Sequence, residues 1–388
     1  MPDLDALRRT VDARLPRFRE ELESLVNIDC GSWTPEGVNQ VADAVADALE
    51  RLGAEVERRP HHPAEGKRQL GDLVIGRLAG DGPRLLLIGH MDTVFDPGTA
   101  AARPYRSDGR RAWGPGVTDM KAGLLAGLHA IGALHEVGVH PAVTFVANPD
   151  EEVGSQFSTP VIRGLASHHD AVLVLECARA NGDIVSARKG IADYHLTYVG
   201  RAAHAGVEPE KGRSAVLEAA RQVVALHALN GRWPSVTVNA GVIHGGTRPN
   251  VVAERCELQV DLRAATTEAF EAAAEEIARL ASNPADLDVR VDLQQVAGHP
   301  PMEKSAASAR LVDLAVRIAG ELGFALRDAA TGGASDANTT AALGIPTVDG
   351  LGPIGGDDHS VDEWLDLESL GPRTTLLAAL MARAGEAL

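Results

Sequence analysis

The chain has 388 residues, of which 45% are hydrophobic and 23% charged, as in a globular protein of about two domains. These proportions exclude a disordered chain, a collagen and a small disulfide scaffold, and no apolar run approaches the roughly 20 residues that a membrane span needs. The net charge of −17 and the aromatic content of only 3% argue against a nucleic-acid partner, and we expect no membrane partner either.

The N-terminal residues predict a cytoplasmic protein, and the cysteines limit the kind of metal site that the chain can form. Residues 1–9 lack the basic-then-apolar pattern of a secretory signal. Cys30, Cys177 and Cys256 are odd in number and lie far apart, and the chain has no C-x-x-C pair. Neither a disulfide framework nor a thiolate zinc site is therefore expected, and any bound metal must be held by nitrogen and oxygen atoms.

The first part of the chain predicts helices and buried strands in alternation. Apolar residues at three- and four-residue steps predict a helix over 4–27, and Thr34 followed by Pro35 begins a second helix that stops at Gly53. A further helix is predicted over 121–137. Short apolar runs predict strands at 72–78, 84–90, 142–148 and 171–176. This alternation is typical of an α/β fold, in which helices flank a mostly parallel sheet.

From about residue 191 the pattern changes to β-α-β-β-α-β, the order of a ferredoxin-like α+β sandwich. The predicted elements are a strand at 194–199, a helix at 214–229, strands at 235–243 and 253–263, a helix at 267–281 and a strand at 288–293. Leu217, Ala220 and Val224 form one face of the first of these helices. Along 253–263, apolar and polar residues alternate, which predicts a strand with one buried face.

After Pro300 and Pro301 the first pattern resumes. A helix at 306–322, a glycine-rich loop at 331–334 and a strand at 345–350 are predicted there. The chain therefore reads as a larger α/β domain, residues 1–190 and 301–388, with a small domain inserted at 191–300.

Five motifs place a metal-type ligand at the end of an apolar strand or in a following loop. They are His90 with Asp92 in LLLIGHMD, Asp119 in GPGVTDMK, Glu151 and Glu152 in NPDEEVGS, Glu176 in VLVLE, and His359 in GPIGGDDHS. Each alone has an ordinary alternative: a strand-end histidine, a helix N-cap carboxylate, a solvated turn, a salt bridge or a surface loop.

Together these residues predict a metal site, because open parallel sheets place their sites at strand ends. Asp92 points to the same side as His90 and could hold the second ring nitrogen of that histidine. Of the adjacent Glu151 and Glu152, one could ligate a cation while the other takes a proton from water. Two metals joined by a bridging carboxylate would use these ligands well, and the donors suit zinc, with cobalt or manganese as substitutes.

In order and spacing the five motifs resemble those of the di-zinc metallopeptidase family that includes glutamate carboxypeptidases, aminoacylase-1, acetylornithine deacetylase and succinyl-diaminopimelate desuccinylase. The resemblance spans about residues 20–380. It is nearest to the glutamate carboxypeptidase branch, through HMDTVF at 90–95 and NPDEEVGS at 148–155.

The resemblance implies a role for each of these residues. Asp119 would bridge two Zn²⁺ ions, with His90 and Glu176 completing one site and Glu152 and His359 the other. Glu151 would be the general base, Asp92 the partner of His90, and the Asp119–Met120 peptide would be cis.

The resemblance also implies that the inserted domain is a lid and dimerisation domain. His204 would reach the active site of a neighbouring subunit in a homodimer and stabilise the oxyanion there. Asn250 and Arg263 would grip the α-carboxylate of the substrate, since the guanidinium fork can bind both carboxylate oxygens.

The expected activity is zinc-dependent hydrolysis of an amide bond next to a free carboxylate, in a small peptide or an N-acyl amino acid. An N-acyl amino acid deacylase or a dipeptidase is an alternative, and a non-catalytic zinc-binding protein is a remote one. No His-Glu-x-x-His motif occurs, which argues against a mononuclear aminopeptidase.

Overall fold

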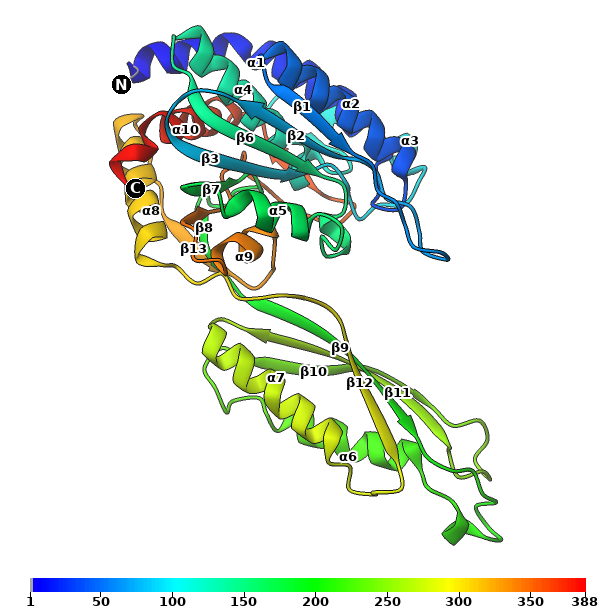
Figure 1. Ribbon diagram of the computed structural model, residues 1–388. Coiled ribbons are helices and arrows are strands. Elements are labelled where there is room, and N and C mark those ends of the chain that lie inside the picture. The colour runs from blue at the N-terminus through cyan, green and yellow to red at the C-terminus, as the bar shows by residue number, and fades with distance from the viewer. Residues whose placement is uncertain (1–2) are drawn as a thin grey trace. The chain divides into compact units, whose positions relative to one another are not determined.

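A six-stranded sheet organises the larger part of the chain in this computed structural model, which describes residues 3–388 (Figure 1). Its strand order is β1-β2-β6-β3-β7-β14, and only β2 runs against the other strands. The strands are β1 (Glu55–Arg59), β2 (Leu73–Leu78), β3 (Asp81–His90), β6 (Pro141–Asn148), β7 (Ala171–Val174) and β14 (Thr347–Val348). The expected mostly parallel sheet is confirmed.

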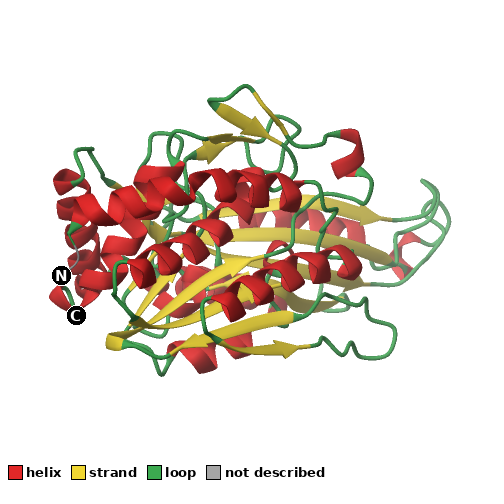
Figure 2. Ribbon diagram, turned by 90° about the horizontal axis from the view of Figure 1, so that it is seen from above, coloured by secondary structure: helices red, strands yellow, loops and turns green. Residues whose placement is uncertain are grey.

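Helices cover both faces of this sheet (Figures 1 and 2). Those on one face are α1 (Leu4–Val26), α2 (Pro35–Arg51), α4 (Ala122–Glu136) and α10 (Leu370–Arg383), and those on the other include α5 (Thr159–Ala166) and α9 (Asp336–Ala341). A Cβ atom on Gly89 would lie 2.8 Å from a methyl carbon of Leu124, so glycine in β3 lets α4 pack closely. The predicted start of α2 at Pro35 is correct, although the Thr34 side chain makes no capping hydrogen bond.

Several short elements were not predicted, because two to five residues are too few to show a periodicity. A four-stranded sheet in the order β15-β16-β5-β4 and a two-stranded sheet of β13 and β8 are among them. The bounds are β4 (Arg106–Ser107), β5 (Arg111–Trp113), β8 (Ile184–Arg188), β13 (Asp328–Thr331), β15 (Gly355–Gly356), β16 (Trp364–Asp366), α3 (Thr99–Ala102), η3 (Pro209–Lys211) and η4 (Ala384–Glu386). Strand β14 is also shorter than the predicted 345–350.

The chain separates into two units by its internal contacts. Unit 1 comprises the residues up to Ser186, Lys304–Ala330 and Ser335–Leu388, and it also contains α8 (Ala306–Glu321). Unit 2 comprises Ala187–Glu303 and Thr331–Ala334. The glycine-rich segment at 331–334 therefore joins unit 2, which the sequence did not indicate.

Unit 2 has the β-α-β-β-α-β order and a four-stranded antiparallel sheet in the order β10-β11-β9-β12. Its elements are β9 (Gly190–Val199), α6 (Ala215–His227), β10 (Thr237–Gly245), β11 (Arg255–Ala264), α7 (Thr267–Ser282) and β12 (Arg290–His299). On β11 the alternation is as predicted, since Cys256, Leu258, Val260 and Leu262 are all buried.

The face of α6 formed by Leu217, Ala220 and Val224 is not the buried one. Leu217 is 52% exposed and Val224 71% exposed. The buried face instead carries Ala215, Glu218, Ala219, Gln222 and Leu226. Small alanines let the helix approach the sheet, and the buried polar side chains have partners: Glu218 accepts from two backbone N–H groups and Gln222 accepts from a tyrosine hydroxyl.

Among residues 3–388, no helix combines the length and the apolar character that crossing a membrane requires.

Candidate functional site

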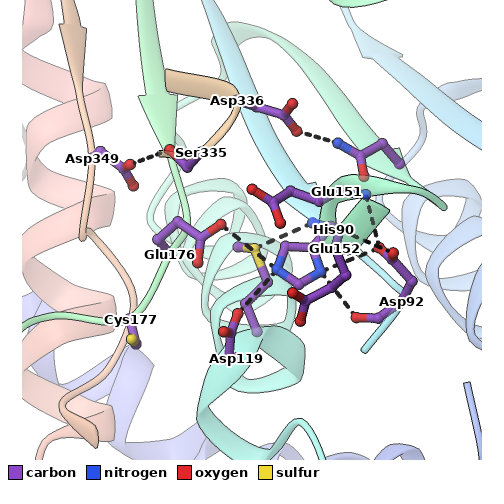
Figure 3. Close-up of polar contacts among 12 residues, drawn as sticks. His90, Asp92, Asp119, Glu151, Glu152, Glu176, Cys177, Ser335, Asp336 and Asp349 are labelled. Atoms are coloured by element: carbon purple, nitrogen blue, oxygen red, sulfur yellow. Dashed lines mark hydrogen bonds and ion pairs between the residues drawn. The ribbon is translucent and has the colours of Figure 1, made fainter. Parts of the chain in front are cut away.

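His90 is the last residue of β3 and is only 1% exposed. Its Nε2 atom lies 3.0 Å from Oδ1 of Asp119 and 3.6 Å from Oε1 of Glu176 (Figure 3). Its Nδ1 atom lies 2.9 Å from the backbone oxygen of Asp92 and 3.4 Å from Oδ1 of the same residue. Asp92 therefore contacts the second ring nitrogen mainly through its carbonyl group.

The Asp92 carboxylate connects β3 with the loop that follows β6. It accepts hydrogen bonds from the backbone N–H groups of Glu151 and Glu152, each at 3.2 Å. The Ser32 hydroxyl donates to its Oδ2 atom at 2.6 Å. These three donors fix the start of the acidic turn η2 (Glu151–Val153) next to His90.

Asp119 lies in the turn η1 (Val117–Lys121), immediately before α4, and its peptide bond to Met120 is cis. Glu363 holds this turn by accepting hydrogen bonds from the N–H groups of Gly116, Thr118 and Asp119 at 2.8, 2.9 and 3.1 Å. The two oxygens of Asp119 are thereby left to face the two histidines.

His359 approaches Asp119 from the loop after β15. Its Nε2 atom lies 3.2 Å from Oδ2 of Asp119 and 3.1 Å from Oε2 of Glu152. Its side chain is 55% exposed, and its backbone φ of 61° is in the left-handed region. This side of the cluster is therefore more open than the side formed by His90.

Glu176 follows β7, and its backbone oxygen accepts a hydrogen bond from the N–H group of Gly352 at 2.8 Å. The buried guanidinium of Arg373 holds the same segment by donating to the backbone oxygens of Gly352, Gly350 and Gly182. Glu176 is thus anchored between a strand end and a loop held by α10.

Two groups of ligand atoms arise from these contacts. The sets His90, Asp119, Glu176 and Asp119, Glu152, His359 each have their ligand atoms within 4.8 Å of one another, and Asp119 belongs to both. The structure thus brings together all five residues that the sequence suggested as ligands. One imidazole and two carboxylates in each set is a donor combination that suits zinc.

The charges in the cluster favour a cation. Burial lowers the pKa of His90, whereas hydrogen bonds to the carboxylates of Asp119 and Asp92 raise it. The carboxylates have the larger combined effect, so the pKa of His90 is well above its usual range. Hydrogen bonds to Asp119 and Glu152 raise the pKa of His359 to about 11. Positive charge is therefore stabilised between these carboxylates, and a divalent cation would supply it.

Glu151 lies beside the cluster and contacts neither histidine through a hydrogen bond. Figure 3 shows its carboxylate on the side where His90 and Glu176 lie. Burial raises the pKa of Glu151 well above its usual range, and the charge of Glu176 raises it further, against an opposing effect of His90. A carboxylate in this environment is a stronger base than an exposed one.

The remaining predicted site residues belong to unit 2. His204 and Asn250 lie in neighbouring segments, since His204 pairs with Val251 in an isolated bridge and Ala205 N–H donates to the Asn250 oxygen. Asn250 precedes the start of β11 at Arg255, whereas Arg263 is the last residue but one of that strand. About 26 Å of strand separates Arg255 from Arg263, so one chain does not bring Asn250 and Arg263 together.

Sequence reasoning missed the residues that hold the ligands in place. Ser32, Glu363 and Arg373 act through hydrogen bonds to segments far away along the chain. Glu363 follows His359 by four residues, which places an acid near the motif but gives no indication of its partners in the turn at Asp119.

Comparison with known proteins identifies relatives over nearly the whole chain. The family model described as "Peptidase family M20/M25/M40" matches residues 86–383. Carboxypeptidase G2 of Pseudomonas sp. strain RS-16 is 32% identical over 376 residues, covering 95% of this chain and 90% of the relative. Succinyl-diaminopimelate desuccinylase of Leptothrix cholodnii is 30% identical over 380 residues, covering 90% and 96%.

Solved structures agree with these sequence relatives. Aminopeptidase PepT from Bacillus cereus superposes with a TM-score of 0.79 at 25% identity, covering 95% of this chain and 98% of that one. An M20 family metallo-carboxypeptidase from Sulfolobus solfataricus has the same fold, with a TM-score of 0.73 at 15% identity and coverage of 94% and 98%. The resemblance read from the five motifs is confirmed. The chain therefore belongs to peptidase family M20/M25/M40 and is a hydrolase.

Proposed function

We propose that this protein uses two zinc ions to hydrolyse an amide bond next to a free carboxylate, in a small peptide or an N-acyl amino acid. The observation that carries the proposal is the pair of ligand sets that share Asp119, with Glu151 beside them. The names of two relatives, a carboxypeptidase and a desuccinylase, support it.

His90, Asp119 and Glu176 would hold one ion, and Asp119, Glu152 and His359 the other. When bound, zinc supplies a Lewis acid that polarises a carbonyl group and increases the acidity of water.

Glu151 takes a proton from the attacking water and delivers it to the nitrogen of the leaving amine. Its location beside the ligands and its raised pKa suit both transfers, because a base with a pKa nearer to neutral can also act as an acid. Asp92 keeps Glu151 in position through the backbone N–H group of that residue.

In the proposed enzyme, Arg263 binds the α-carboxylate of the substrate, and His204 and Asn250 complete the site of a neighbouring subunit. The separation of Asn250 from Arg263 along β11 supports a composite site, because one chain cannot bring both to one carboxylate. The exposed apolar residues Leu217 and Val224 on α6 give unit 2 a surface that a second copy would cover. We therefore propose a homodimer formed through unit 2, which would also act as a lid.

We also propose a cytoplasmic location. The three cysteines are unpaired and buried, which is consistent with a reducing compartment.

Metal content measured together with hydrolysis tests this function. The protein is reconstituted with zinc, cobalt or no metal and assayed on N-acyl amino acids, dipeptides and glutamate-terminated peptides. About two metals per chain with metal-dependent cleavage is expected, and the preferred substrate distinguishes a carboxypeptidase from a deacylase or a dipeptidase. Absence of bound metal and of turnover after reconstitution would instead indicate a non-catalytic protein.

A further inference from the structure

A pocket of about 540 Å³ lies in unit 1, at the edge of the sheet that carries His90. The strand register locates it: His90 of β3 pairs with Asn148 of β6, and Val74 of β2 pairs with Ala147. Strand β2 therefore begins at the edge where β3 and β6 end. Residues 60–72 connect the end of β1 with the start of β2 at this same edge of the sheet. They form one wall of the pocket.

The pocket is close to the metal ligands. Two strand spacings, together about 10 Å, separate β2 from β3. On one side, Trp33 follows Ser32, whose hydroxyl donates to Asp92 at 2.6 Å. On the other side, Phe157 is held by its N–H group, which donates to Oδ2 of Asp150 at 2.7 Å, and Asp150 immediately precedes Glu151. Both walls are therefore continuous with segments that position the acidic turn η2.

The lining combines aromatic rings with positive charge. The Arg68 guanidinium lies 4.4 Å from the centroid of the Trp33 ring, and the rings of His61 and Phe157 meet edge to face at 4.9 Å. Lys67 lines the same pocket, and none of the lining residues in the described chain is acidic. Trp33 remains 41% exposed, so its ring is accessible.

The two cations have no anionic partner of their own. Within residues 3–388, neither Lys67 nor Arg68 forms an ion pair with an acidic side chain, although the chain carries 54 acidic residues and a net charge of −17. A bound anion would pair with them, and a planar ring would pack against the exposed part of the Trp33 ring. An aliphatic anion would pair with the cations but lacks the planar ring, and an aliphatic cation would meet neither requirement.

We propose that this pocket binds an aromatic ring that carries an anionic group, as the acyl end of the substrate. The assignment to the acyl end rests on the proposed function. Substrates of this class are N-aroyl amino acids with an acidic substituent on the ring.

Kinetics on a matched series tests the proposal in the zinc-supplemented protein. N-acetyl, N-benzoyl and N-(4-carboxybenzoyl) derivatives of one amino acid are compared by kcat/KM, and the 4-carboxybenzoyl compound should be preferred. Arg68→Ala and Trp33→Ala should each lower the ratio of kcat/KM for 4-carboxybenzoyl over acetyl by about 3- to 30-fold. Arg232→Ala removes a similar arginine–tryptophan contact in unit 2, over Trp233 at 5.0 Å, and should leave the ratio unchanged.

Calorimetric titration with terephthalate, benzoate and hexanoate separates this proposal from the proposed function. Terephthalate should bind to the protein most tightly, and Arg68→Ala should weaken that binding while Arg232→Ala does not. Metal-dependent hydrolysis without an aromatic-acid preference would overturn the pocket assignment and leave the proposed function intact. Absence of hydrolysis together with Arg68-dependent terephthalate binding would support the pocket and overturn the proposed function.

Discussion

His90 and His359 face opposite oxygens of the same carboxylate, that of Asp119. The Nε2 atom of His90 is 3.0 Å from Oδ1, and that of His359 is 3.2 Å from Oδ2. The histidines come from a buried strand end and from an exposed loop, so a single side chain joins two otherwise separate sets of ligands. Removal of this carboxylate should therefore affect both sets together.

Asp119→Asn should lower the metal content from about two per chain to below one and abolish turnover. The amide that replaces the carboxylate has one acceptor oxygen and a donating NH₂ group, so it cannot serve both sides as an anion. Metal per chain after dialysis, measured by elemental analysis, checks this. Asp313→Asn, at an exposed position on α8, is the control. Retention of two tightly held ions in Asp119→Asn would show that the carboxylate is not shared.

Glu151→Gln should keep both metals and lose activity by about 10²- to 10⁴-fold, because the amide cannot accept the proton of water. The neighbouring Glu152→Gln gives the matched comparison. Since Glu152 contacts His359 at 3.1 Å, its loss should lower the metal content first. Steady-state kinetics at measured metal occupancy distinguishes the two variants, and high activity in metal-replete Glu151→Gln would exclude it as the base.

Glu363→Gln should destabilise the turn that carries Asp119. The carboxylate accepts three backbone N–H groups, and the NH₂ group of glutamine would oppose at least one of them. A buried donor without an acceptor costs about 1–3 kcal/mol. Urea unfolding should report this loss, with a parallel decrease in zinc affinity. Glu368→Gln, an exposed glutamate with a side chain that is 68% exposed, should change neither quantity.

Mixed dimers test the composite site. His204→Ala and Arg263→Ala should each be nearly inactive alone, yet a mixture that is dissociated and reassociated should recover activity. Half of the randomly formed dimers then contain one intact site, so recovery of about a quarter of the wild-type activity is expected. A mixture that remains inactive, although size exclusion shows a dimer, would argue that both residues serve the site of their own chain.

Protonation of Glu21 on α1 should account for part of the stability that the fold loses at acidic pH. Burial raises its pKa, but the contacts with His129 and Arg17 at 2.9 and 2.8 Å outweigh burial and lower the pKa from 4.5 to about 2. The unfolded chain therefore binds more protons in this window, and the stabilisation that is complete above pH 4.5 is lost as the pH falls toward 2.

Urea midpoints at pH 7 and pH 3 measure this effect. Glu21→Gln should show a smaller decrease in stability between the two pH values than the wild type. Glu20→Gln, at the adjacent exposed position, should behave like the wild type. An equal decrease in all three proteins would contradict the assigned importance of the Glu21–His129 contact.

The five metal motifs could be predicted from the sequence because apolar strands and the polar residues that end them are local patterns. The carboxyl ends of parallel strands meet at a common edge of the sheet, so the sequence predicts that His90, Glu151 and Glu176 lie near one another. The β-α-β-β-α-β order could be predicted for the same reason, because each of its elements is indicated by a local pattern. In contrast, the sequence pattern did not indicate which face of α6 is buried, because Glu218 and Gln222 are buried with partners that a helical period does not reveal.

Sequence alone determined which residues could ligate metal and in which order the elements follow. Only the tertiary structure decided which groups hold those ligands. Glu363 accepts hydrogen bonds from the turn at Asp119, and Arg373 donates hydrogen bonds to the loop beside Glu176. The tertiary structure also decided that Asn250 lies before the start of β11, whereas Arg263 lies near the end of that strand. The physical reason is that hydrogen bonds between distant segments depend on the packing of the whole chain, whereas periodicity and turn residues act over a few neighbours.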